Sequence, residues 1–399
     1  EMKLLQLNHQ EKICFALLAS DPLFTGLGIP MHFTLVDIVY AIAFTIYCRE
    51  RNFRKIIISV PLIIWILLTV YQYSNAIIKG VPLMSVLNLF HGFKIYACLC
   101  IFSYWASIDF SKTIKCLVKC FILDLFVILA FSDMSTGRLS GVMWATGLGQ
   151  LAAFIGVYIA YYVALNKISF SKILRLYSFP FIIIILTQSR NSLGILGITL
   201  LASIIAYYTV RGKVFSTKNL MFMLLFAILL LILSPYIMDS AFLQRAMEAK
   251  EASEDSFYMQ ENATGTIFDD IVGDRLFYYL TGWELFLKHP LTGIGLYNFQ
   301  FVTGGDFPLH TEYMVHLCEG GLIAACLWLA FLYNVLKGII YFKENYLIKI
   351  IALVSIISLL FCGIYAREFY TEFFYPVYGV ALSLTFTRKI FHKSLLCKV

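Results

Sequence analysis

The 399-residue chain has few charged residues. Aspartate, glutamate, lysine and arginine together make up 14% of it, whereas a soluble domain carries about 25%. Hydrophobic residues make up 60%, and the mean hydropathy is +0.80. A surface this apolar excludes a water-soluble globular protein. Many runs reach the roughly 17 to 25 apolar residues that a helix needs to cross a bilayer, so the composition predicts a polytopic membrane protein.

Several motifs are also missing. The chain has no phosphate-binding glycine loop, no dinucleotide fingerprint and no serine-elbow motif. No cysteine lies between Cys120 and Cys318, which excludes a disulfide within that stretch. Cys116 and Cys120 lie one helical turn apart, but no histidine or further cysteine pair stands beside them in the sequence, and we interpret them as apolar packing. We therefore expect no required metal and no cofactor.

The fold class that the apolar runs predict is all-α, an integral membrane bundle of about twelve transmembrane helices with one large polar loop. The loop divides the chain into 1–239, with nine spans, 240–312, the loop itself, and 313–399, with three spans and the C-terminus. The predicted spans are 13–30, 33–48, 56–74, 84–105, 114–131, 141–164, 172–188, 191–210, 219–238, 313–336, 348–365 and 372–387.

Charge predicts the orientation. Most of the 31 lysines and arginines fall in alternate loops and at both ends of the chain, and cytoplasmic loops are enriched in these residues. Both termini are then cytoplasmic, and the 240–312 loop is exported. This asymmetry accounts for most of the net charge of +7, so we expect no nucleic-acid partner.

The loop changes character along its length. It begins acidic and turns amphipathic from Arg275 to Leu287, where apolar residues follow a helical stripe. His289 and Pro290 then end the pattern. We expect one or two short helices here.

Four arginines stand where the orientation rule disfavours them. Arg190 lies in a short polar segment between two apolar runs. An arginine within the membrane costs free energy unless it faces a polar cavity or an anion. Arg275 begins the amphipathic helix and suits bidentate phosphate binding. Arg138 and Arg367 lie at outer helix ends. Snorkelling to headgroups and pairing with a neighbouring acid are the structural alternatives.

His310 is a different kind of candidate, because histidine is the side chain most easily poised as a base near neutral pH. Glu312 follows it by two residues and could orient it, although a histidine at a membrane edge is often only interfacial. Two pairs are weaker candidates for lining a polar cavity: His91 with Lys94, and His316 with Glu319.

These residues, in this order, resemble the O-antigen polymerase and ligase superfamily, bacterial inner-membrane glycosyltransferases of the GT-C type. The likeness covers roughly residues 140–388. It is carried by Thr187 to Arg190, Asp274 with Arg275, Gly282 to Gly295, His310 to Tyr313, and Glu319 to Leu322. The family often has asparagine after the histidine, where this chain has Thr311.

The resemblance implies an active site that faces the periplasm and a metal-independent, inverting transfer from an undecaprenyl diphosphate-linked glycan. Arg190 and Arg275 would bind the donor diphosphate, and His310 would act as the catalytic base on the acceptor hydroxyl. Glu312, Arg138, Arg367 and Tyr313 are supporting candidates.

The main hypothesis is a polymerase of O-antigen or a similar surface polysaccharide, whose acceptor is a lipid-linked repeat unit and whose further partner is a chain-length regulator. A ligase with lipid A-core as acceptor is the close alternative, because donor site and base would be shared. A transporter or flippase of lipid-linked oligosaccharide is more distant, since transporters usually show paired broken helices in two related halves.

Overall fold

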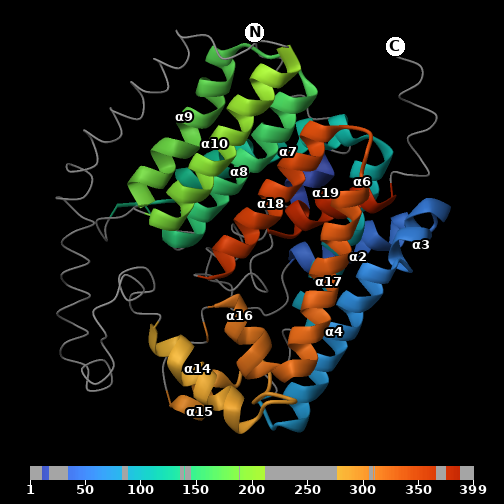
Figure 1. Ribbon diagram of the computed structural model, residues 1–399, viewed down its shortest axis with the longest axis vertical. Helices are drawn as coiled ribbons and strands as arrows, with labels where there is room; N and C mark the ends of the chain where they lie inside the picture. The colour runs from blue at the N-terminus through green and yellow to red at the C-terminus, as the bar shows by residue number, and fades with distance from the viewer. Residues whose placement is uncertain are drawn as a thin grey trace.

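The computed structural model describes residues 11–17, 35–82, 89–134, 139, 145–187, 189–211, 276–304, 309, 311–364 and 374–386. The secondary structure of these ranges is helical (Figure 1). The helices are α2 (Leu35–Tyr47), α3 (Arg51–Ile57), α4 (Val60–Ile78), α6 (Leu89–Ile108), α7 (Phe110–Ala130), α8 (Ala145–Leu165), α9 (Phe170–Thr187), α10 (Arg190–Arg211), α14 (Leu276–Lys288), α15 (Phe299–Thr303), α16 (Glu312–Met314), the π-helix η4 (Val315–Glu319), α17 (Gly321–Tyr341), α18 (Tyr346–Gly363) and α19 (Tyr375–Phe386).

Six of the described helices contain a stretch long and apolar enough to cross a membrane, namely those in α4, α8, α9, α10, α17 and α18. The apolar parts of α2, α6 and α19 are shorter. The chain is therefore a multi-pass, all-helical protein, as predicted. The expected number of about twelve spans remains a prediction, and the expected span at 219–238 lies outside the described residues.

Polar residues mark several helix starts. Asp109 caps α7 by accepting a hydrogen bond from the N–H of Lys112 at 2.9 Å, and Asn345 caps α18 in the same way through two N–H groups. Pro61 lies in the first turn of α4, where its missing N–H costs nothing. The predicted span at 56–74 is thus divided, because α3 ends at Ile57 and α4 begins at Val60.

Helix α8 occupies the middle of one group of helices and packs against α7, α9, α10 and α18 (Figure 1). Glycines bring α8 close to α10, since a β-carbon at Gly149 would lie 2.6 Å from that of Ser189, and one at Gly156 would collide with Thr199. Small residues allow this kind of close approach between membrane helices. The approach sets the position of the first turn of α10, where Arg190 stands.

Helices α4, α17, α19 and α6 form a second group, in which α17 packs on α4 and α19, and α19 on α6. Lys94 of α6 forms a buried ion pair with Asp37 of α2 (3.7 Å). This intramembrane lysine therefore has an acidic partner from another helix, which satisfies the need for charge pairing in lipid. The side chain of His91, predicted to pair with it, lies outside the described residues.

Candidate active site

The turn that follows α14 is joined to the break that precedes α17 by backbone hydrogen bonds. The N–H of Ile294 donates to Cys318 O (2.9 Å), and the N–H of Gly295 donates to Glu319 O (2.9 Å). Three residues after Glu319, the N–H of Leu322 donates to Pro290 O (2.8 Å). These bonds fix α14 relative to the start of α17.

Two glycines make the junction possible. Gly293 and Gly321 have φ angles of 66° and 68°, a region that suits glycine. A β-carbon at Gly293 would lie 2.5 Å from the carbonyl carbon of Glu319, and one at Gly321 would lie 2.5 Å from the backbone nitrogen of Gly293. The two backbones can meet only because neither glycine carries a side chain.

The expected span at 313–336 is consequently wrong as one continuous helix. The chain forms a single turn of α-helix (α16), then the π-helix η4, and only then α17. The break at Gly321 reverses the backbone torsion for one residue, and apolar periodicity does not record such a change.

Gly293→Ala is expected to destabilise the protein by about 3 kcal/mol or more, since the left-handed backbone costs about 1 to 3 kcal/mol and the overlap with Glu319 adds to it. Gly304→Ala is the matched control, because Gly304 has nearly the same φ, 68°, but its β-carbon would meet nothing within 4 Å. The thermal midpoints of both variants, measured in detergent, test this. An equal decrease of the thermal midpoint in the two variants would show that the close approach of Gly293 to Glu319 does not contribute to stability.

Helix α4 braces the junction through polar side chains near its C-terminus. The Tyr71 hydroxyl donates to Gly320 O at 3.0 Å, and the Asn75 amide donates to Thr292 O at 2.5 Å. The brace thus contacts both sides of the junction. The expected site residues do not include Tyr71 and Asn75, although polar side chains three or four positions apart in an apolar helix are a signal of a buried polar contact.

Next to these contacts, His316, Glu312 and Gln72 form a buried polar network. His316 Nε2 lies 2.9 Å from Glu312 Oε1, and His316 Nδ1 lies 3.2 Å from the Gln72 amide nitrogen. The imidazole also stacks on Trp328, with ring centroids 4.8 Å apart. Glu312 and His316 are 2% and 1% exposed. The two ring nitrogens of His316 thus link Glu312 of α16 to Gln72 of α4.

His316 and Glu319, expected as a weaker pair lining a polar cavity, are both buried but face different partners. The Glu319 carboxylate accepts a hydrogen bond from the backbone N–H of Phe299 at 3.4 Å, at the start of α15. Glu319 therefore positions α15, whereas His316 joins α16 to α4.

Three helix ends meet at the last turn of α18. The Tyr279 hydroxyl of α14 donates to Ile364 O at 2.9 Å, and the Tyr313 hydroxyl of α16 donates to Leu360 O at 2.7 Å. On the other side, a β-carbon at Gly194 of α10 would lie 3.6 Å from the ring of Phe361. Figure 1 shows α18 running between the group α8 to α10 and the group α14 to α16. The end of α18 is thus a common anchor for both groups.

The predicted site residues stand next to these anchors in the sequence. Arg190 is the first residue of α10, four positions before Gly194, and its side chain lies outside the described residues. Arg275, His310 and Arg367 also lie outside them. Arg275 directly precedes α14, four positions before Tyr279, and Arg367 follows Ile364 by three.

The neighbours of His310 and Arg138 are described. Leu309 and Thr311 flank His310, and both are fully buried; the Thr311 hydroxyl accepts a hydrogen bond from the N–H of Met314 (3.2 Å) and so caps α16. Arg138 lies outside the described residues, but the N–H of the adjacent Leu139 donates to Leu186 O (2.9 Å), near the end of α9.

Comparison with known proteins shows that part of the chain matches one protein family. The family model described as O-antigen ligase matches residues 176–329, a stretch that runs from α9 through α14 and α16 into α17. No curated protein matches the chain significantly. The matched stretch contains Arg190, Arg275 and His310, together with Glu312 and Tyr313. The match supports placing the chain in the O-antigen polymerase and ligase superfamily.

Proposed function

We propose that the chain is a polymerase of O-antigen or a similar surface polysaccharide in the bacterial inner membrane. It transfers a growing glycan from undecaprenyl diphosphate to the non-reducing end of a lipid-linked repeat unit. The family match supports a membrane glycosyltransferase of this general type, and the described geometry supports a single site built from distant parts of the chain.

The observation that carries the proposal is the common anchor at the end of α18. Gly194 lies where a β-carbon would reach the Phe361 ring, and Tyr279 and Tyr313 donate hydrogen bonds to Ile364 O and Leu360 O. In the sequence they follow Arg190, Arg275 and His310 by four, four and three residues, which is about one helical turn. The two arginines and the histidine span residues 190 to 310, and each therefore lies about one helical turn in sequence from a residue beside the end of α18. This supports a single site for transfer from a lipid diphosphate.

In the proposed reaction, the guanidinium groups of Arg190 and Arg275 bind the diphosphate and stabilise the negative charge that develops as it leaves. His310 accepts the proton of the acceptor hydroxyl as its oxygen attacks the anomeric carbon. One carbon–oxygen bond forms to the acceptor, and the bond to the diphosphate breaks with inversion. Activation comes from the lipid diphosphate, so the reaction needs neither a metal nor a nucleotide.

The expected result with purified protein in liposomes is a ladder of products when lipid diphosphate-linked repeat units are the sole substrate. Each rung adds one repeat unit, and the products separate on a gel. A protein that transfers nothing, with or without added lipid A-core, would contradict the enzyme assignment and favour a transporter.

A ligase is the second candidate, and the description of the matched family as O-antigen ligase favours it. A ligase would give no ladder until lipid A-core is supplied, and would then give one product for each donor. The same assay therefore distinguishes the two acceptors.

We also propose that the segment between α10 and α14 faces the periplasm and that both termini are cytoplasmic. A single cysteine introduced between residues 250 and 265 of a cysteine-free chain is expected to react with a membrane-impermeant maleimide in intact spheroplasts. Reaction only after the membrane is opened would reverse the orientation. A cysteine at exposed Lys172, in the first turn of α9 and on the side expected to be cytoplasmic, serves as the opposite control.

A further inference from the structure

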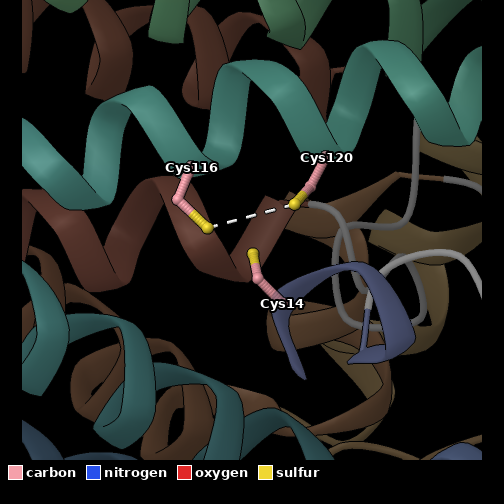
Figure 2. Close-up of side chains that lie close together, drawn as sticks. All are labelled: Cys14, Cys116 and Cys120. Atoms are coloured by element: carbon pink, nitrogen blue, oxygen red, sulfur yellow. Dashed lines mark hydrogen bonds between the residues drawn. The ribbon is translucent and has the colours of Figure 1, made fainter. Parts of the chain in front are cut away.

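Three cysteines gather where the helical residues 11–17 contact α7. The Sγ atoms of Cys14, Cys116 and Cys120 all lie within 4.8 Å of one another, and those of Cys116 and Cys120 are 3.9 Å apart. Figure 2 shows the Cys14 side chain pointing toward the space between the other two thiols. All three side chains are buried and none is in a disulfide.

The spacing fits thiolates that share one metal ion. Zinc binds thiolate sulfur at about 2.3 Å in tetrahedral geometry, which places neighbouring sulfur atoms about 3.8 Å apart. The 3.9 Å between Cys116 and Cys120 already matches this separation. Cys14 needs only a side-chain adjustment, because its sulfur lies within 4.8 Å of both.

The sequence did not point to this cluster, because Cys14 lies about a hundred residues before the other two. The i and i+4 spacing of Cys116 and Cys120 puts both on one face of α7, and the fold adds the third ligand from another segment. A ligand pair on one helix with a distant third ligand is undetectable as a motif.

We propose that Cys14, Cys116 and Cys120 form a structural zinc site that attaches residues 11–17 to α7. Soft thiolate ligands select thiophilic ions such as Zn²⁺ and Cu⁺. Zinc is the better match, since three buried thiolates retain one negative charge with Zn²⁺ but two with Cu⁺, and uncompensated buried charge is costly. Three protein ligands leave one position of a tetrahedral ion for a ligand from outside the protein.

Polar contacts near the cysteines also link residues 11–17 to α7. Lys119 donates to the Glu11 carboxylate at 2.7 Å, and the Cys120 thiol lies 3.4 Å from Glu11 O. Asp124 continues the face of Cys116 and Cys120 by one more turn, and one of its carboxylate oxygens is buried without a hydrogen-bond partner among the described residues.

The site is separate from the proposed transfer reaction, which needs no metal. None of its residues belongs to the junction or to the α18 anchor, and they all precede the stretch that matches the family. The zinc would act on stability and on the position of the N-terminal helix. Loss of the metal and loss of glycan transfer are thus independent outcomes.

The test is the metal content of the full-length chain, purified in detergent without chelators and measured by mass spectrometry. We expect about one zinc per chain in the unmodified protein and a loss of nearly all of it in Cys14→Ser and Cys120→Ser. Cys100→Ser is the matched control, because Cys100 is equally buried but lies on α6 outside the cluster; it should retain the zinc.

A second measurement needs no variant and therefore does not depend on how the variants fold. The unmodified chain is stripped with chelator and alkylated with and without added Zn²⁺, and the modified cysteines are mapped. Zinc should protect Cys14, Cys116 and Cys120 severalfold while leaving Cys100 unchanged. A chain that contains copper instead of zinc, or one that binds no zinc and shows no protection, would overturn the proposal.

Discussion

His310→Ala is expected to eliminate polymer formation in cells and in liposomes. General base catalysis contributes about 10²- to 10⁴-fold to a rate, and a growing chain multiplies any loss over each added unit. The protein should still be made at a normal level, because the buried neighbours Leu309 and Thr311 and the cap that Thr311 forms on α16 are unchanged. The readout is the length distribution of the polysaccharide beside the amount of protein in the membrane.

The matched control is His289→Ala, which removes an exposed histidine from the turn after α14. It should leave the length distribution as it is. Long-chain polysaccharide at a normal level in cells that carry only His310→Ala would refute the assigned base. A defect in both variants would instead indicate that the segment is sensitive to any change.

Arg190→Ala and Arg275→Ala are each expected to reduce transfer by about 10²-fold, since a positioned donor to developing negative charge contributes this much. Lysine at either position should restore little, because an ammonium cannot form the paired hydrogen bonds of a guanidinium with phosphate. The double variant should lose less than the product of the single losses, as residues acting on one group are not additive.

The initial rate against donor concentration measures this effect, with acceptor in excess. Arg175→Ala is the control, because Arg175 is exposed and its guanidinium bonds to Ser171 O, one turn back on the same helix. Unchanged dependence on donor concentration and unchanged rate in both single variants would remove the diphosphate role from the two arginines. If only the dependence of the rate on acceptor concentration changed, the two arginines would be assigned to acceptor binding.

The helices that could be predicted from the sequence are those whose ends are marked by local chemistry. The amphipathic stripe from Arg275 to Leu287 and the stop at His289-Pro290 correspond to α14, Leu276–Lys288. Helices α9 and α10 likewise lie close to the expected spans at 172–188 and 191–210. Periodicity and breakers act within a few residues, so they are visible in one sequence.

The junction could not be predicted, because its causes are distant in sequence. The break at Gly321 depends on the approach of Gly293, and the His316 network depends on Gln72 of α4. Tyr313, expected as a supporting residue of the site, is bonded to the backbone of α18. Partners more than twenty-five residues apart leave no local pattern, and only the fold brings them together.

The two tyrosine bonds at the end of α18 have main-chain carbonyls as their acceptors. The last carbonyls of a helix have no partner within the helix, so the acceptors exist wherever the helix ends and do not depend on its side chains. Apolar exchanges at Leu360 or Ile364 would keep both bonds, whereas one residue added to or removed from α18 would rotate its final turn by about 100° and break them. These two bonds therefore depend on the length of α18 and not on which apolar residues occupy its last turn.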